Sequence, residues 1–326
     1  MDFIMSHMTM IVFSILFVLG VVFLVLFLRD YWMHRHALEA ETKWGTTCTI
    51  GFTTNFIDAM GIGSFAPITA LVKIFKQCRD KHIPGVLNVG LTIPVIVEGM
   101  IFIKEVEVQP LTLFSMLLAA AVGAYIGAGI VSKFSEQRIR LIVGVALMIT
   151  AVMMILGMAN LIPAGGTATG LVGWKLIVAV GCNFILGALM TAGIGLYAPC
   201  MALVYFMGMN PLIAFPLMMG SSAVLMPVAS VRFIKEGTYN RKAAMAIMVS
   251  GIAGVVIATQ LVIGLPMEAL RILVLCVVVY TSLSMLYSYH KGKSEPETAE
   301  GDCFQKDNGL DEVSNAVPAH GGNASL

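Results

Sequence analysis

Charged residues are scarce in this sequence. Only 12% of its 326 residues are Asp, Glu, Lys or Arg, whereas 58% are hydrophobic, and the mean hydropathy is +0.88. These values exclude an ordinary water-soluble globular domain and predict an all-α polytopic membrane protein, because helices satisfy their own backbone hydrogen bonds inside a bilayer. The formal net charge is +1 and no basic stripe occurs, so we expect no nucleic acid partner.

The sequence also lacks the motifs of metal sites and of common hydrolytic enzymes. Its six cysteines form no Cys-x-x-Cys pair, which argues against a zinc site or a disulfide framework. No His-Glu-x-x-His, Gly-x-Ser-x-Gly or paired-aspartate motif is present. We therefore expect no metal, no cofactor and no enzymatic activity; an intramembrane enzyme is the main alternative from another functional class.

The sequence contains a seven-residue motif that occurs twice in similar form, and we call it the repeated phrase. Gly-Ile-Gly-Ser-Phe-Ala-Pro at 61–67 returns as Gly-Ile-Gly-Leu-Tyr-Ala-Pro at 193–199. At nearly the same offset, Phe-Ile-Lys-Glu at 102–105 is repeated at 233–236. Two similar halves with Gly/Pro-interrupted apolar segments are typical of secondary transporters, whose substrate site lies where the interrupted segments meet.

Apolar runs and polar stretches divide the chain into four parts. Residues 1–45 are predicted to form an N-terminal transmembrane helix and an interfacial segment, the latter a helix at the headgroup level from Arg29 to Lys43. Residues 46–160 and 175–290 form two membrane repeats, and the polar residues 291–326 a disordered cytoplasmic tail. Seven apolar runs have the roughly 20 residues that a membrane-crossing helix needs: 9–28, 85–103, 110–132, 139–159, 212–231, 243–264 and 270–288.

Two longer apolar stretches, 46–72 and 175–207, carry the repeated phrase and are interrupted by it. If each crosses the membrane once, the Lys and Arg residues of the connectors divide almost evenly between the two sides. If each enters and leaves on one side as a re-entrant hairpin, only Lys104, Lys175 and Arg271 remain outside, which agrees better with the positive-inside rule. We therefore predict hairpins, an outside N-terminus, a cytoplasmic C-terminus, and two inverted repeats of one hairpin and three crossing helices each.

The two hairpin tips are predicted to form an anion site. Glycine permits a positive φ, and a proline four residues later fits the first turn of a restarting helix, so each tip would present free N–H groups. No Arg or Lys lies beside either tip in the sequence, so we expect the site to have no fixed cation. The alternative is that these small and polar residues only allow tight helix packing. The candidate substrate-binding residues are Asn55, Gly61, Gly63, Ser64, Asn183, Thr191, Gly193, Gly195 and Tyr197.

Two acidic residues, Asp58 and Glu98, lie within apolar sequence. Ionisable groups inside a membrane are costly to bury and are therefore functional candidates, so either acid could carry a coupling proton. Asp58 comes three residues before the Gly-Ile-Gly turn and is the favoured candidate, whereas Glu98 could reach the membrane interface.

Together these features resemble the TauE/SafE family of permeases, the sulfite exporter or 4-toluene sulfonate uptake family. The resemblance rests on Gly61 to Pro67, on Gly193 to Pro199, and on the duplicated layout over about residues 46–290. It implies transport of a small anion, often a sulfur-containing oxyanion or organosulfonate such as sulfite, across the bacterial cytoplasmic membrane. The chain departs from the family pattern where the usual Gly-Gly pair is replaced by Ser64-Phe65 and by Leu196-Tyr197.

The sequence thus predicts a multi-pass permease of the cell membrane that carries its anion by alternating access. An anion channel of the same architecture is the alternative, and a structural subunit of a membrane complex is a weaker one. A carrier saturates and shows counterflow, whereas a pore does not. The expected partners are the anionic substrate and the lipid bilayer. The formation of a homodimer, the identity of the anion, the coupling ion and the direction of transport stay open.

Overall fold

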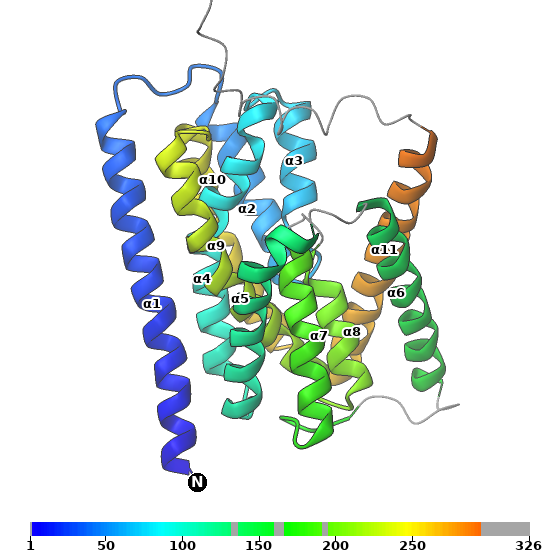
Figure 1. Cartoon of the computed structure of the whole chain (residues 1–326). Coiled ribbons are helices and arrows are strands. Elements are labelled where there is room, and N and C mark those ends of the chain that lie inside the picture. Colours follow the sequence, from blue (N-terminus) through cyan, green and yellow to red (C-terminus); the bar gives the residue numbers. More distant parts are fainter. Residues whose placement is uncertain (1, 132–135, 160–165, 191–194, 295–326) are drawn as a thin grey trace, which may run out of the picture.

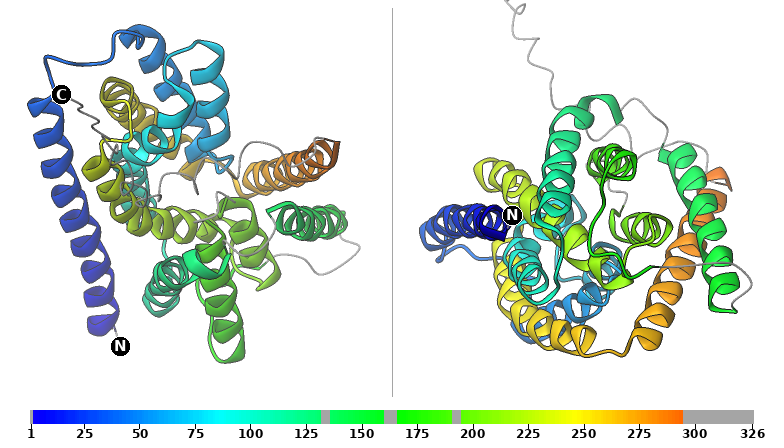
Figure 2. Two further views of the ribbon diagram at one scale, coloured as in Figure 1. Left: turned by 45° about the horizontal axis from the view of Figure 1, so that its top comes forward. Right: turned by 90° about the horizontal axis from the view of Figure 1, so that it is seen from below.

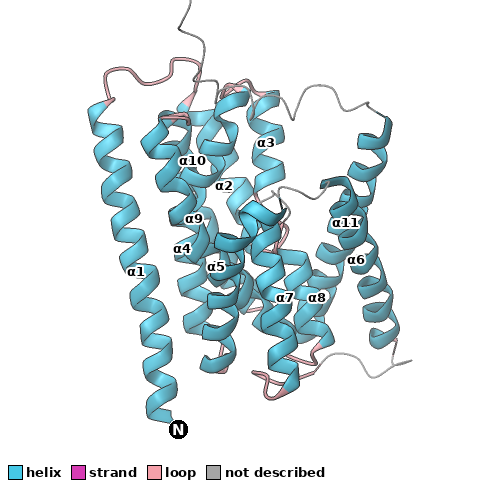
Figure 3. Ribbon diagram, in the orientation of Figure 1, coloured by secondary structure: helices cyan, strands magenta, loops and turns pink. Residues whose placement is uncertain are grey.

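The computed structural model describes residues 2–131, 136–159, 166–190 and 195–294, and it is helical throughout these ranges apart from loops and one isolated bridge (Figures 1 and 3). The prediction of an all-α fold is confirmed for this part of the chain. In chain order the helices are α1 (Asp2–Met33), α2 (Trp44–Ala59), α3 (Phe65–Ile74), η1 (Asp80–His82), α4 (Ile83–Glu105), α5 (Pro110–Val131), α6 (Glu136–Met158), α7 (Trp174–Met190), α8 (Tyr197–Phe206), η2 (Pro211–Ile213), α9 (Ala214–Glu236), α10 (Arg241–Ile263) and α11 (Met267–Ser294).

Six helical stretches of the described chain are long and apolar enough to cross a membrane. They lie at six of the seven runs for which a single crossing is predicted. The seventh, α5, counts over Pro110–Ile126 as a shorter apolar helix. The six stretches are Thr9–Met33, Asp80–Glu105, Ile139–Met158, Pro211–Glu236, Arg241–Ile263 and Met267–His290.

Three loops meet at one end of the bundle through polar contacts. The Thr42 hydroxyl donates to the backbone oxygen of Gln77 at 2.8 Å, and the Asn240 amide donates to the Thr42 hydroxyl at 2.9 Å. Arg79 also forms an ion pair with Glu41 at 3.4 Å. We call this the basic loop end because its loops carry Arg35, Lys43, Lys76, Arg79 and Lys81; it comprises residues 34–43, 75–82 and 237–240.

Three other loops meet at the opposite loop end, which comprises residues 106–109, 166–173 and 207–210. The Gln109 N–H donates to the oxygen of Thr169 at 2.9 Å, and the Asn210 N–H donates to the oxygen of Ala168 at 3.0 Å. Helix α4 runs from the basic loop end to the opposite one, and α9 runs the other way. The two ends therefore lie one helix length apart, as Figure 1 also shows.

The interrupted segments each begin and end at the same side of the molecule. Just before α2, the Lys43 N–H donates to the side chain of Gln77, just after α3, at 2.7 Å. At the other side, Lys175 at the start of α7 donates to the oxygen of Met207, just after α8, at 3.4 Å. Both α3 and α8 have 10 residues, and at about 1.5 Å per residue they are too short to cross a hydrocarbon layer of roughly 30 Å.

The main helix pairs join one half of the chain to the other. Helix α2 packs on α10 and α7 packs on α5, while α4 pairs with α9 and α6 with α11. Glycine allows the first two contacts. A Cβ on Gly254 of α10 would overlap the Phe52 oxygen of α2, and a Cβ on Gly123 of α5 would overlap the Phe184 oxygen of α7. Small residues of this kind let membrane helices approach closely.

The long first helix and the α6–α11 pair lie on opposite sides of the bundle (Figure 2). The prediction of an interfacial helix from Arg29 to Lys43 is wrong, because α1 continues to Met33 and turns and a loop follow. The end of α1 is held by Asp30, which accepts hydrogen bonds from Tyr239 at 2.5 Å and from Arg241 at 2.7 Å. The sequence predicts that the tail begins at residue 291, but α11 extends to Ser294. Residues 295–326 lie outside the described residues.

Candidate functional site

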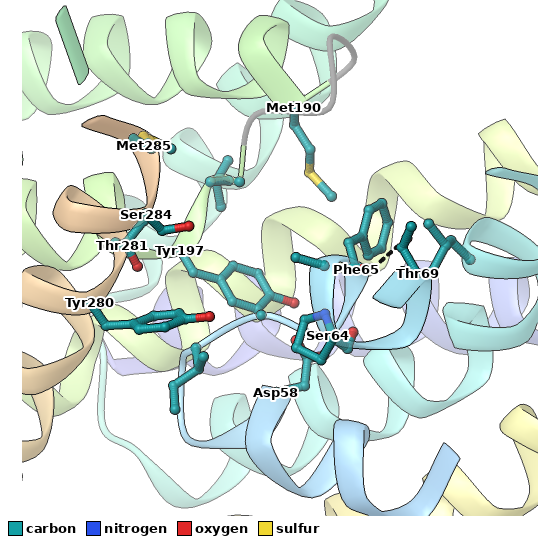
Figure 4. Close-up of a pocket in the computed structure, with 18 of the residues that line it drawn as sticks. Asp58, Ser64, Phe65, Thr69, Met190, Tyr197, Tyr280, Thr281, Ser284 and Met285 are labelled. Carbon is teal, nitrogen blue, oxygen red and sulfur yellow. Dashed lines mark hydrogen bonds between the residues drawn. The ribbon is translucent and has the colours of Figure 1, made fainter. Parts of the chain in front are cut away.

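A cavity of about 590 Å³ lies where the two interrupted segments face each other. Its walls come from the turn after α2, from α3 and from the start of α8, with α6 and α11 on the other side. In Figure 4, Tyr197 and Tyr280 extend from their helices toward Ser64 and Asp58. The residues from α3, α6 and α11 place the cavity on the basic-loop side of the two turns.

The backbone of the first turn is left-handed at two glycines. Helix α2 ends at Ala59, and Gly61 and Gly63 have φ angles of +92° and +91°, a region that other residues rarely adopt. The Gly61 N–H donates to the backbone carbonyl oxygen of Asp58 at 2.7 Å, and this hydrogen bond closes the turn. Helix α3 then begins at Phe65 with Pro67 in its first turn, where the missing N–H costs no hydrogen bond. The prediction of positive φ is confirmed at both glycines.

The second turn lies partly outside the described residues, which is where Thr191 and Gly193 fall. Gly195 lines the cavity and is not among the described glycines with positive φ. Tyr197 begins α8 and also lines the cavity. The first turn is in contact with α8, since a Cβ on Gly61 would overlap the side chain of Met201 in that helix.

The two intramembrane acids lie together behind the first turn. Asp58 of α2 is 1% exposed and Glu98 of α4 is 0% exposed. The hydroxyl and N–H of Ser64 and the hydroxyl of Tyr197 donate to the Asp58 carboxyl, and Glu98 is close enough to act on it electrostatically. Asp58 lines the cavity, whereas Glu98 is not among its lining residues. The interpretation that Glu98 reaches the interface is wrong, because its carboxyl is buried in the middle of α4.

One known protein family matches part of this chain. Residues 2–154 match the family model of the sulfite exporter TauE/SafE. The resemblance drawn from the sequence is confirmed over this range, which is just under half of the chain and contains α1 to α5, most of α6 and the first turn. No curated protein and no solved structure matches the chain. The TauE/SafE match and the six apolar spans indicate a multi-pass membrane transport protein.

The two predicted asparagines do not line the cavity. Asn55, inside the TauE/SafE range, donates to the Gly51 oxygen at 2.7 Å and packs against Gly251 of α10. Asn183 donates to the Met116 oxygen of α5 at 2.7 Å. Each is fully buried between the helices of a cross-half pair, so their observed contacts are packing contacts. Gly61 likewise stands behind the cavity wall, while Gly63 and Ser64 line it.

Sequence reasoning missed the side of the cavity that faces the turns. Arg140 of α6, still within the TauE/SafE range, lines it, so the expectation of a site without a cation is wrong. From the sequence, Arg140 counts among the connector charges because it stands at the start of the apolar run 139–159. In the structure it lies one turn inside α6. From α11, beyond the TauE/SafE range, come Tyr280 and three hydroxyl residues at helical spacing, a polar stripe that the sequence could have revealed: Thr281, Ser284 and Ser288.

The chemistry of this lining suits an anion. Apart from the Asp58 carboxyl group, the polar side chains of the lining are hydroxyl groups and a guanidinium, which are donors, and the rest of the cavity wall is largely apolar. No group of three or more His, Cys, Asp or Glu side chains in the described part of the chain could hold a metal ion.

Proposed function

We propose that this protein is a secondary transporter that moves a small sulfur-containing oxyanion or organosulfonate, such as sulfite, by alternating access. The observation that carries the proposal is the cavity at the junction of two interrupted segments, lined by Ser64, Tyr197 and Arg140. Interrupted helices in other transporters place their substrate sites at such a junction. The TauE/SafE match supports the choice of a sulfur anion as substrate.

We further propose that the α2–α3 and α7–α8 segments are re-entrant hairpins in two inverted repeats. The first begins and ends at the basic loop end and the second at the opposite loop end. The cross-half pairs α2–α10 and α7–α5 support a shared architecture, because each joins the first helix of one half to the fourth helix of the other half. By the positive-inside rule the basic loop end is cytoplasmic.

An asymmetry between the halves supports the alternating-access part of the proposal. The α6–α11 pair packs against α8, but it has no comparable contact with α3, the counterpart of α8 in the described chain. The cavity lies between α3 and the α6–α11 pair, on the side of the two turns nearer the basic loop end. In this state it therefore faces the basic loop end. Movement of the pair from α8 to α3 would close this side and open the other.

Transport by purified protein in liposomes tests the function. We expect saturable uptake and counterflow for sulfite and 4-toluenesulfonate, with no uptake of a neutral sugar. Flux that rises linearly without counterflow would indicate the channel, and absence of flux for every anion would contradict transport by this chain alone.

Arg140→Gln provides the site-specific prediction for the same assay. Loss of one charged hydrogen-bond donor is expected to raise the KM for the anion about tenfold while leaving membrane insertion unchanged. The matched control is Arg140→Lys, which keeps the charge and should retain a KM nearer that of the wild type. An unchanged KM in Arg140→Gln would remove this residue from the anion site.

A further inference from the structure

We propose that Asp58 and Glu98 form a single proton site, that the two carboxyl groups hold one shared proton, and that this proton moves together with the anion. This inference rests on the proposed transport function and names its coupling ion. It differs from the sequence-based hypothesis, in which one acid or the other carries the proton.

The surroundings of the two carboxyl groups carry the argument. Both are at most 1% exposed, and Asp58 Oδ2 and both carboxyl oxygens of Glu98 have no hydrogen-bond partner among the described residues. A buried, unpaired carboxylate is costly, and two such negative charges that repel each other in a medium of low polarity are more costly still. One proton held by the pair removes one of the two negative charges.

No basic side chain replaces that proton. The groups that act on the pair are the hydroxyl groups of Ser64 and Tyr197 and the N–H of Ser64. Arg140 and Tyr280 line the same cavity on its far side. The other charged side chains described on α4 and on the helices packed around α2 and α4 lie toward the loop ends: Arg29 and Asp30 on α1, Lys73 on α3, Asp80 and Lys81 on η1, Lys104 and Glu105 on α4, Arg232, Lys235 and Glu236 on α9, and Arg241 and Lys242 on α10.

The position of Asp58 links the proton to the anion. When Asp58 is ionised, it accepts the hydrogen bonds of Ser64 and Tyr197. Those donors also line the cavity, so an anion bound there competes with the Asp58 carboxylate for them. Protonation of Asp58 releases the donors and removes the negative charge that repels the anion. Proton and anion therefore favour each other's binding, which is the condition for cotransport in the same direction.

The same geometry gives an order of events. Asp58 lines the cavity and receives the proton from water, whereas Glu98 stands behind it and stabilises the proton on the pair. Tyr197 belongs to α8 of the second half, and its hydroxyl also interacts with Ser222 of α9. A change of charge at Asp58 therefore alters the hydrogen bond that Tyr197 of α8 makes to it. Helix α8 is the helix against which the α6–α11 pair packs in this state.

Infrared spectroscopy on protein in lipid tests the shared proton without requiring transport. We expect a carbonyl band of a protonated carboxylic acid at neutral pH, with a shift on exchange into deuterated water. The band should shift in Asp58→Asn and in Glu98→Gln, because the one remaining buried acid then holds the proton without a second carboxyl group near it. It should be lost in the double variant and stay unchanged in the exposed control Glu107→Gln. A wild-type protein without this band would overturn the inference even if anion flux is normal.

Liposome uptake of 4-toluenesulfonate, whose sulfonate group does not titrate near neutral pH, tests the coupling. An inwardly directed proton gradient should drive accumulation in the wild type and in Glu107→Gln. Asp58→Asn, Glu98→Gln and the double variant should each lose this accumulation to the same extent, because the two acids act as a unit. A thermal unfolding midpoint and a size-exclusion profile like those of the wild type show that each variant is folded.

The outcomes separate the two proposals. Saturable uptake that no proton gradient drives, or that a sodium gradient drives instead, would overturn the proton site and leave the transport function standing. Absence of all flux in a wild type that shows the carboxylic acid band would contradict the transport function and leave the shared proton in place. Additive losses in the double variant would contradict a single shared site.

Discussion

At the scale of single residues, the first turn depends on two glycines with left-handed backbone. The φ angles of Gly61 and Gly63 bring Ser64 back over the end of α2, so that its N–H and hydroxyl meet Asp58. The turn thus supplies both the donors for an anion and the acid that competes for them. Changing its backbone should alter the site as well as the stability.

Replacement of these glycines by alanine tests that dependence. Gly61→Ala and Gly63→Ala are each expected to destabilise the protein by about 1–3 kcal/mol, the usual cost of a side chain held in a sparsely populated backbone region. Gly195→Ala is the matched control, because Gly195 has open space around it and no positive φ. Thermal unfolding in detergent measures the difference. Equal midpoints for all three variants would contradict the strain argument.

At the scale of helices, the cross-half pairs depend on backbone contact at glycine. Gly254 brings α10 against the Phe52 oxygen of α2, and Gly123 brings α5 against the Phe184 oxygen of α7. These glycines are 131 positions apart and contact equivalent helices. The two pairs therefore have the same kind of interface, which an inverted repeat would produce.

The prediction at this scale is that the two interfaces respond alike to the same change. Gly123→Ala and Gly254→Ala should each lower stability by about 1–3 kcal/mol, because a methyl group has no room beside a carbonyl oxygen of the neighbouring helix. Gly181→Ala on α7 is the control, since nothing lies within 4 Å of its added Cβ. Stability measured by thermal unfolding should fall for the first two only. A loss at one interface alone would argue against equivalent packing.

At the scale of the whole molecule, charge separates the two loop ends. The basic loop end is held together by several polar contacts, including those of Thr42 with Gln77 and Asn240. The N-terminal start of α1 lies at the other side of the bundle (Figure 1). In the proposed orientation, which follows the positive-inside rule, the cavity opens to the cytoplasm.

Cysteine labelling in intact cells tests this orientation. A membrane-impermeant maleimide should label Glu107→Cys directly and Lys81→Cys only after the cells are permeabilised. Native Cys78 should interfere little, because burial and the neighbouring Glu41, Glu39 and Asp80 raise the pKa of its thiol to about 12, which leaves almost no reactive thiolate. The reverse labelling pattern would invert the molecule and place the cavity opening outside.

The sequence by itself determined the membrane class, the duplication and the location of the first turn, since these follow from hydropathy, from a repeated phrase and from the local preferences of glycine and proline. It did not place Asp58 beside Glu98, nor Arg140 across from Ser64. In a membrane protein both lipid-facing and buried helix faces are apolar, so hydropathy carries little information about which helices meet. Only the tertiary packing decided that α2, α4 and α8 bring two acids and a tyrosine together, and that α6 and α11 complete the cavity.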